Sequence, residues 1–228
     1  MQQKGAEPMC GRYVLAEIEA LAGRFNVEAQ LPPVAARYNV APTQTMPVIV
    51  KHSPNQLVLM RWGLQPSWAR EGKAESALIN ARAETLAQKR TFRQLLSSRR
   101  CLVPASGFYE WQQTGSGKVP HYISLKDERL FAFAGLYDHW TDEQGQDVYS
   151  YTIITTAPNA LMAAIHNRMP AILRREEEES WLNPDETEAE RLLPLLKPYP
   201  AEMMQAAAVS RAVNNVRNEG PTLRQPLQ

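Results

Sequence analysis

Cysteine is scarce in this sequence, and its scarcity argues against two classes of protein. The 228 residues include two cysteines, Cys10 and Cys101, which are too few for a disulfide framework. The four histidines are scattered, and none stands at a spacing to either cysteine that is typical of a zinc site. We therefore expect a cytoplasmic protein with no metal and no other cofactor.

Long apolar runs and a secretory signal are also missing. No run approaches the roughly 20 apolar residues that cross a bilayer, and the first residues, MQQKGAEP, are polar. With 44% hydrophobic and 21% charged residues, the composition is that of a soluble protein with a sizeable core. No membrane partner is expected.

Excess charge is absent as well. A net charge of +1 argues against a protein that coats nucleic acid by bulk attraction. It stays compatible with a local basic groove, because lysines and arginines can gather on one face. Four glutamates run together at 176–179, whereas many arginines stand beside turn and loop motifs.

The hydrophobic patterns predict a mixed order of helices and strands, with no long linker and no internal repeat. We therefore expect a single α+β domain with a curved, mostly antiparallel β-sheet core flanked by helices. Residues 1–9 are interpreted as a polar leader, 10–220 as the domain and 221–228 as a loose tail. Helices are predicted over 14–25, 84–98, 175–182 and 186–196, an ordered loop over 30–47, and strands over 47–50, 57–64, 101–111, 121–125, 130–137 and 150–156.

Seven short segments combine polar or charged residues with glycine, proline or aromatics. Such mixtures are common in loops that a rigid sheet holds in place. Taken singly, none of them is specific. They are MCGRY (9–13), RYNVAPT (37–43), RWGLQPSW (61–68), INARAET (79–85), SGFYEW (106–111), IHNRMP (165–170) and VSRAVNNVRN (209–218).

Together and in this order, the segments resemble the SRAP family (SOS-response-associated peptidase, also called abasic-site processing proteins). The resemblance runs from Met9 to about Gly220. It implies a covalent bond between an N-terminal cysteine and the aldehyde of an abasic site in single-stranded DNA, as part of the SOS response to DNA damage. A monomer that associates with the nucleoid when bound to DNA is expected.

The implied chemistry suits Cys10. A free N-terminal cysteine carries an amine and a thiol on adjacent carbons, so the amine can form a Schiff base and the thiol can close a thiazolidine ring. An α-amine has a pKa of about 7.7–8.0, which leaves a useful fraction neutral. An internal cysteine cannot react in this way because its nitrogen is part of a peptide bond. The alternative for Cys10 is a small buried hydrophobic residue.

Eight residues precede Met9, where the family pattern begins with a methionine that is removed to expose cysteine. Three interpretations are open: a misplaced start, a cloning scar, or a propeptide removed when the thiol attacks the preceding peptide bond. We favour the misplaced start, because Met9 directly precedes Cys10. As written, the chain should be unable to form the thiazolidine.

Three further catalytic residues are carried over from the resemblance. Glu110 would move protons during Schiff-base formation and self-cleavage, and aromatic neighbours would raise its pKa. His166 would assist opening of the sugar ring and act on the crosslinked aldehyde. Asn80, an amide that does not titrate, would position the sugar or the amine. The alternatives are a strand-surface carboxylate, a structural histidine and a turn residue.

Arg12, Arg82 and Arg168 each stand two residues after a proposed reactive residue. Residues two apart in an extended segment face the same side, so each arginine is expected beside its reactive group, where it would contact phosphate. Any of them could instead be an ordinary surface charge.

Eight other residues complete the candidate DNA contacts. Aromatic rings would stack on unpaired bases, each contributing roughly 1–3 kcal/mol, although such rings are as often in the core. The stacking candidates are Trp62, Trp68 and Phe92; the pocket-wall candidates, by resemblance, are Asn39, Pro42 and Thr155; the weaker phosphate candidates are Arg211 and Arg217.

We therefore expect a DNA-repair protein, an enzyme that crosslinks to abasic sites in single-stranded DNA, with cysteine autopeptidase and lyase-type activity. Two alternatives remain open. One is a thiol autopeptidase or peptidase whose DNA binding is secondary, and the other is a non-covalent single-strand binder.

Overall fold

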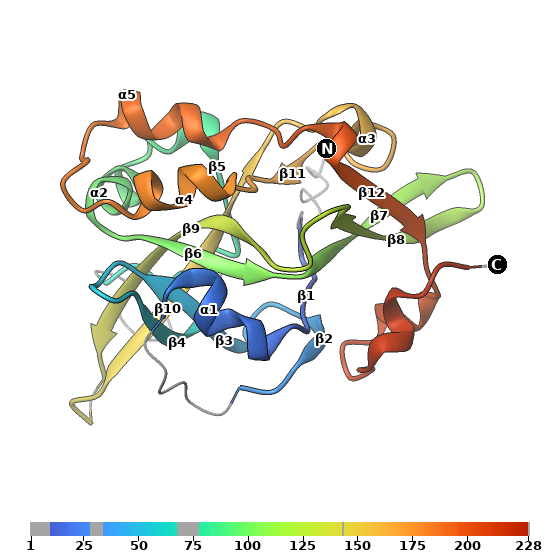
Figure 1. The fold of residues 1–228 in the computed structure, drawn as a ribbon, viewed down its shortest axis with the longest axis horizontal. Coiled ribbons are helices and arrows are strands. Elements are labelled where there is room, and N and C mark those ends of the chain that lie inside the picture. Colours follow the sequence, from blue (N-terminus) through green and yellow to red (C-terminus); the bar gives the residue numbers. More distant parts are fainter. Residues whose placement is uncertain (1–9, 28–33, 68–77, 143, 228) are drawn as a thin grey trace, which may run out of the picture.

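Two β-sheets form the centre of the structure, and short helices lie around them (Figure 1). The computed structural model describes residues 10–27, 34–67, 78–142 and 144–227. Within these ranges the paired strands are antiparallel, except that β10 runs parallel to β4 and β5. The architecture confirms the prediction of an α+β domain with a mostly antiparallel sheet core.

The larger sheet is a seven-stranded one that closes on itself, because β10 pairs with both β4 and β9. The strands β10, β4, β3, β6 and β9 follow one another around this ring, and β5 and β11 pair with β10. The bounds are β3 Thr45–Val50, β4 Gln56–Trp62, β5 Asn80–Arg82, β6 Arg100–Ala105, β9 Phe131–Thr141, β10 Asp147–Thr156 and β11 Met169–Pro170.

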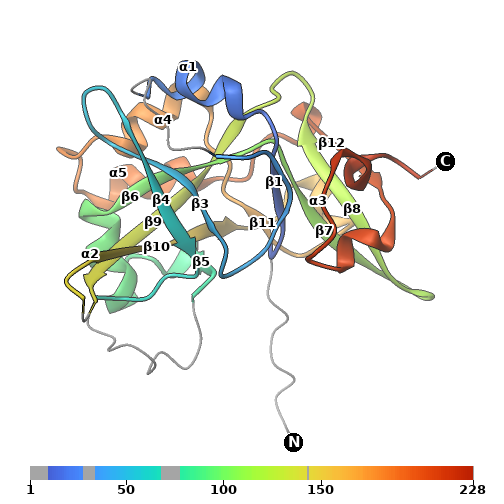
Figure 2. The same cartoon turned by 90° about the horizontal axis from the view of Figure 1, so that it is seen from below.

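The smaller sheet has five strands in the order β12-β8-β7-β1-β2. Its central strands bring the N-terminal part of the domain against the middle of the chain, since β1 pairs with both β2 and β7 (Figure 2). The bounds are β1 Tyr13–Leu15, β2 Arg37–Val40, β7 Gly107–Thr114, β8 Gly117–Leu125 and β12 Met204–Ala208.

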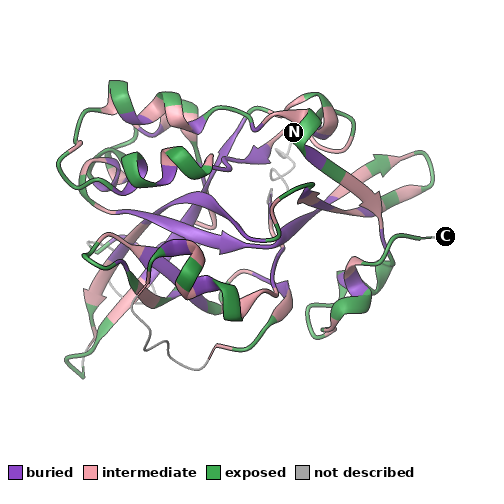
Figure 3. Cartoon of the chain, viewed as in Figure 1, coloured by how far each residue is buried: buried purple, intermediate pink, exposed green. Residues whose placement is uncertain are grey.

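The core lies between the strands, where continuous apolar runs are buried on both faces (Figure 3). Every residue of β6 is buried, as is most of β9. Gly135 lets these two strands approach closely, because a Cβ atom there would lie 2.8 Å from Sγ of Cys101. Cys101 is fully buried, and burial raises the pKa of its thiol, which keeps the thiol protonated at neutral pH.

Helices cover the outside of the sheets, and α2, α4 and α5 lie together on one side (Figure 1). In the described residues none of the helices is both long enough and apolar enough to span a bilayer. The bounds are α1 Leu21–Phe25, α2 Arg90–Ser98, α3 Ala160–Ala163, α4 Arg175–Leu182 and α5 Ala189–Leu192, with 3-10 turns at η1 Ile18–Ala20, η2 Ala83–Thr85, η3 Leu193–Leu196, η4 Ala201–Met203, η5 Arg211–Asn214 and η6 Pro221–Arg224.

Two predicted elements are wrong over part of their length. The predicted helix over 14–25 starts only at Ile18, because the preceding apolar residues are buried in β1 between two partner strands. The predicted loop over 30–47 contains β2, which pairs with β1, and the start of β3. In both cases pairing within the sheet outweighs the local pattern.

The predicted loose tail over 221–228 is also wrong for the residues described there. Pro221–Arg224 forms η6, and Leu223 is buried against Val14 and Tyr109. The amide of Leu227 donates to the carbonyl oxygen of Ala208 at 2.8 Å. A buried leucine and a main-chain hydrogen bond therefore anchor a segment whose composition is typical of a tail.

Candidate functional site

Cys10 and Glu110 meet at the N-terminal end of the described chain. The main-chain nitrogen of Cys10 donates a hydrogen bond of 2.7 Å to Oε1 of Glu110. Both residues are 4% exposed. The pairing of β1 with β7 produces this contact, because the amide of Tyr109 donates to the carbonyl oxygen of Arg12 and fixes the register nearby.

Burial sets the protonation of this pair. Burial raises the pKa of Glu110, while the charge of His166 and the hydrogen bonds from Cys10 oppose the rise. Burial and the neighbouring Glu110 raise the pKa of the Cys10 thiol well above its usual value, against the charge of Arg168. The thiol is therefore protonated at neutral pH, and a nucleophilic thiolate would need a base to form.

His166 follows the short helix α3 and is held by its own loop. Its amide donates to the carbonyl oxygen of Met162 at 2.7 Å, and Gln112 on β7 donates from Nε2 to the carbonyl oxygen of Ala164 at 2.9 Å. Nδ1 of His166 accepts the amide of Arg168 at 3.2 Å. The neutral ring must then carry its proton on Nε2, where it can be donated.

The segments 79–85 and 165–170 meet at the end of β10. In the parallel pairing of β5 with β10, Asn80 lies opposite Ile153 and Arg82 opposite Thr155. Thr155 in turn lies opposite Pro170 of β11. Asn80 is half-buried, Arg82 is exposed and Thr155 is buried.

Arg168 is the cation that binds these two segments together. Its Nη1 and Nη2 donate to Oε1 and Oε2 of Glu84 at 2.6 and 2.9 Å. Nη2 also donates to the carbonyl oxygen of Thr155 at 2.7 Å. The sequence patterns did not single out Glu84, which lies inside the INARAET segment, or Gln112, which follows Glu110 by two positions on the same strand.

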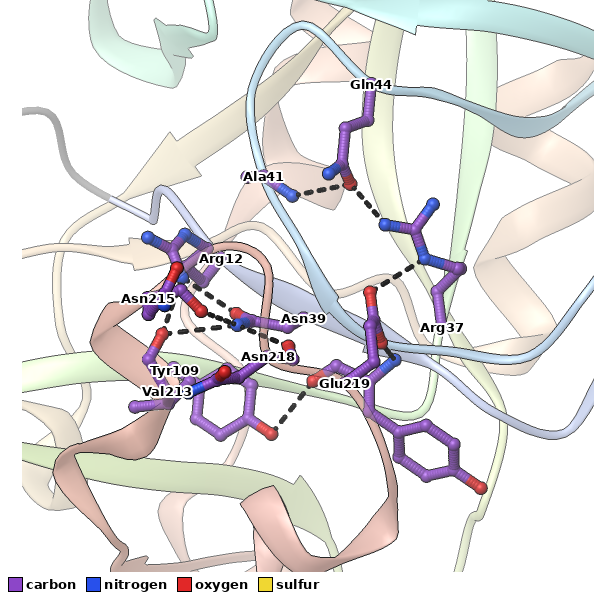
Figure 4. A network of polar contacts seen from close by, with 11 residues as sticks. Arg12, Arg37, Asn39, Ala41, Gln44, Tyr109, Val213, Asn215, Asn218 and Glu219 are labelled. Carbon is purple, nitrogen blue, oxygen red and sulfur yellow. Dashed lines mark hydrogen bonds and ion pairs between the residues drawn. The ribbon is translucent and has the colours of Figure 1, made fainter.

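The recorded contacts of Arg12 are with Asn39, Trp111 and the segment around Val213. Its Nη1 donates to Oδ1 of Asn39 at 2.8 Å and to the carbonyl oxygen of Val213 at 2.7 Å (Figure 4). Its guanidinium also lies over the ring of Trp111. These contacts hold the start of the domain against β2 and η5.

Asn39 is fully buried and holds the C-terminal segment (residues 209–227) on the five-stranded sheet. Its Nδ2 donates to the carbonyl oxygens of Val213, Asn215 and Asn218 at 3.2, 3.0 and 3.0 Å (Figure 4). Trp111 adds a bond of 2.8 Å from Nε1 to Oδ1 of Asn214. The side chain of Asn39 is thus committed to the fold.

The two described stacking candidates are in the core, which corrects that expectation. Trp62 is fully buried and donates from Nε1 to the carbonyl oxygen of Ile79, and its ring centroid lies 5.3 Å from that of Tyr13. Phe92 is 4% exposed on the inner face of α2. Neither ring offers a face to a base in this structure. Trp68 lies outside the described residues.

Among the described residues, the structure records no contact between the remaining candidates and the Cys10–Glu110 pair. Pro42 is half-buried in the turn between β2 and β3. Arg211 and Arg217 are exposed on the C-terminal segment. Within the ranges that the structure describes, no three histidine, cysteine or acidic residues gather in a way that could hold a metal ion.

The nitrogen of buried Cys10 donates a hydrogen bond to buried Glu110, and the charge of His166 acts on the same carboxyl group. This arrangement fits the class of proteins whose reactive residue is a cysteine. The family model described as "SOS response associated peptidase (SRAP)" matches residues 9–216. The chain belongs to this family, which confirms the resemblance drawn from its motifs.

Relatives and solved structures agree with this membership. The chain is 47% identical over 220 residues to the abasic site processing protein YoqW of Bacillus subtilis, covering 94% of this chain and 98% of that one. It is 37% identical to the abasic site processing protein HMCES of Gallus gallus, over 84% of this chain and 66% of that protein. A crystal structure of a Bacteroides thetaiotaomicron protein superposes with a TM-score of 0.87 and 33% identity, covering 96% of this chain and all of that one.

Proposed function

We propose that this protein processes abasic sites in DNA by bonding covalently to them through Cys10, once Cys10 is the N-terminal residue. The observation that carries the proposal is the 2.7 Å hydrogen bond from the nitrogen of Cys10 to Glu110. When no residue precedes Cys10, this nitrogen is the α-amine that attacks the aldehyde. A carboxyl group is then already within reach of the protons that the reaction moves.

The reaction balances with the groups at hand. The amine adds to the aldehyde carbon of the opened sugar, and the resulting hydroxyl group leaves as water to give a Schiff base. The thiol of Cys10 then adds across the carbon–nitrogen double bond and its proton passes to the nitrogen, which closes the thiazolidine. Glu110 takes a proton from the attacking amine and returns one to the leaving hydroxyl. Burial raises the pKa of Glu110, which makes its carboxyl group a stronger proton acceptor than that of an exposed glutamate.

His166 and the arginines complete the proposed site. His166 donates its Nε2 proton to the ring oxygen of the closed sugar, which opens the ring to the aldehyde. Arg82 and Arg168, at the junction of β5, β10 and β11, bind phosphates on either side of the abasic sugar. Asn80, on the same strand as Arg82, positions the sugar.

Single-stranded DNA is the proposed partner, with the protein acting as a monomer in the cytoplasm and on the nucleoid during the SOS response. The names of the relatives support abasic sites as the substrate, and the motif resemblance supports single-stranded DNA as the partner. Phosphate contacts carry no base code, so recognition is expected to depend weakly on sequence.

A second candidate function, self-cleavage before Cys10, uses the same hydrogen bond. The thiol would attack the carbonyl carbon that precedes Cys10 while its proton passes to Glu110, and the nitrogen of Cys10 would leave as an amine with that proton. Water would then hydrolyse the resulting thioester, which releases residues 1–9 and restores the thiol. The φ of 45° at Cys10 favours this candidate, since a left-handed L-residue costs roughly 1–2 kcal/mol and cleavage would release it.

One experiment separates these functions. Protein that begins at Cys10 and protein that retains residues 1–9 are incubated with single-stranded DNA containing one abasic site, and the products are run on a denaturing gel. Covalent processing predicts a shifted band with the first protein alone. Self-cleavage predicts that the longer protein shortens with time and then gives the same band. Non-covalent binding predicts no shifted band with either.

A further inference from the structure

We propose that Glu84 occupies the phosphate site of Arg168 in the free protein, so that DNA phosphate must displace a carboxylate before it can bind there. The inference rests on the proposed function, because it assigns Arg168 to DNA phosphate. It adds a residue that competes with DNA at that position.

The geometry of the pair is that of an arginine with a bound oxyanion. The two outer nitrogens of Arg168 reach the two oxygens of Glu84 at 2.6 and 2.9 Å. Guanidinium groups bind carboxylate and phosphate through the same two parallel hydrogen bonds. The edge of Arg168 that would face a phosphate is therefore already filled.

Arg168 is fixed independently of Glu84. Nη2 also donates to the carbonyl oxygen of Thr155 at 2.7 Å and approaches its Oγ1 at 3.3 Å. The side chain of Arg168 is 14% exposed, whereas that of Glu84 is 51% exposed. Glu84 can therefore turn into solvent while Arg168 stays against β10.

Charge makes Glu84 a competitor rather than a neutral spacer. Its hydrogen bonds with Arg168 lower the pKa of the carboxyl group, so it is ionised at neutral pH. It stands two positions from the exposed Arg82, beside the second proposed phosphate contact. A phosphate arriving at either arginine meets this negative charge, which weakens non-covalent binding of any DNA strand. Stable capture then depends on the covalent bond, which undamaged DNA cannot form.

A purely positioning role for Glu84 gives the opposite expectation. If Glu84 were needed to hold Arg168 in place, its loss would weaken DNA binding. The two roles are therefore separated by the direction in which affinity changes.

The experiment measures the affinity of the full chain, beginning at Cys10, for an undamaged single-stranded oligonucleotide by fluorescence anisotropy over a range of NaCl concentrations. The variants are Glu84→Gln and the control Glu176→Gln, an exposed glutamate on α4 that pairs with Arg174 at 3.8 Å. We expect Glu84→Gln to bind roughly threefold to fivefold more tightly. Its salt slope should be steeper by about 0.7, the value for one more phosphate contact on a single strand. Glu176→Gln should match the wild type.

Equal or weaker binding by Glu84→Gln, relative to Glu176→Gln, would overturn the inference. So would tighter binding that persists when Glu84→Gln is combined with Arg168→Gln, because the gain must act through Arg168. Failure of the proposed function is a separate outcome: the wild-type protein would then form no adduct with abasic DNA, whatever Glu84→Gln does to affinity.

Discussion

The main-chain nitrogen of Cys10 lies 2.7 Å from Oε1 of Glu110, a residue one hundred positions further along the chain. The register of β1 against β7 brings the two together, with Tyr13 opposite Phe108. Both partners are buried, so the carboxyl group and the nitrogen are held in one arrangement. A group that can move protons is thus placed at the nitrogen that becomes reactive when Cys10 is N-terminal.

Replacing the cysteine tests the bond-forming step. In protein that begins at residue 10, Cys10→Ala removes the thiol and should abolish the stable adduct with abasic DNA. Non-covalent affinity should stay within about twofold, because the small side chain is buried and its loss leaves the phosphate contacts in place. A denaturing gel and an anisotropy titration measure the two quantities. An adduct that survives heat and detergent in Cys10→Ala would exclude the thiazolidine.

Glu110→Gln tests the proton transfer. The amide keeps the shape of the side chain but cannot take a proton, so the single-turnover crosslinking rate should fall by about 10²-fold or more. Chains beginning at Cys10 are mixed with abasic DNA and quenched at intervals to measure it. An unchanged rate would remove Glu110 from the reaction.

The same substitution has an opposite effect on stability. Because burial raises the pKa of Glu110, the native protein keeps this proton to higher pH than the unfolded chain. The wild-type free energy of unfolding is therefore lowered as pH rises from about 4.3, the usual pKa of glutamate, through the folded value. Glu110→Gln cannot lose this proton, so its free energy of unfolding should exceed that of the wild type at about pH 8. The difference between the two proteins should shrink as the pH falls toward about 4. Urea unfolding at several pH values measures the difference; a gap that widens in acid would contradict the sign.

His166→Ala tests the opening of the sugar. Loss of the Nε2 proton donor should slow crosslinking by roughly tenfold to a hundredfold and leave DNA affinity unchanged. His52→Ala, at an exposed position after β3, is the control for loss of a histidine and should react as the wild type does. Equal single-turnover rates in the two variants would show that His166 has no part in the reaction.

Asn39→Ala tests the role assigned to the C-terminal segment. The substitution removes one acceptor from Arg12 and one donor from each of three carbonyl oxygens. Arg12 still bonds to Val213, and Asn215 still accepts the amide of Asn218, so the carbonyl oxygen of Asn218 loses its recorded partner. The free energy of unfolding should fall by about 1–3 kcal/mol, the usual cost of an unsatisfied buried polar group. Chemical denaturation measures the loss. A change below about 0.5 kcal/mol would mean that this network contributes little.

The strands of the ring were predictable from sequence because they are long and apolar. The run at 130–137 overlaps β9 and the run at 150–156 lies within β10, and both strands are buried over most of their length. The run at 101–111 was predicted as one strand, yet it divides at Ser106, whose amide bonds to the carbonyl oxygen of Val14 as the chain passes from one sheet to the other. The hydrophobic pattern of a segment does not show where the chain leaves one sheet and joins another.

The reactive residues could be predicted from their motifs, but the residues that surround them could not. Cys10 and Glu110 were selected together from the resemblance, and the structure brings them into contact. The contacts of Arg12 have no local signal, because its partners Asn39 and Val213 lie 27 and 201 positions away along the chain. Trp62 was a candidate for stacking on bases because aromatic rings occur both in cores and on binding surfaces. Only the packing of the folded chain shows that Trp62 is in the core. The tie between Arg168 and Glu84 joins residues 84 positions apart and has no local signal.

The most direct test of covalent processing is the intact mass of protein that begins at Cys10, recorded before and after incubation with single-stranded DNA carrying one abasic site. We predict a new species whose mass is the sum of protein and DNA less one water molecule, as Schiff-base formation and ring closure require. The species should be absent with undamaged DNA and with Cys10→Ala. A spectrum in which the protein beginning at Cys10 keeps its original mass in the presence of abasic DNA would contradict the proposal.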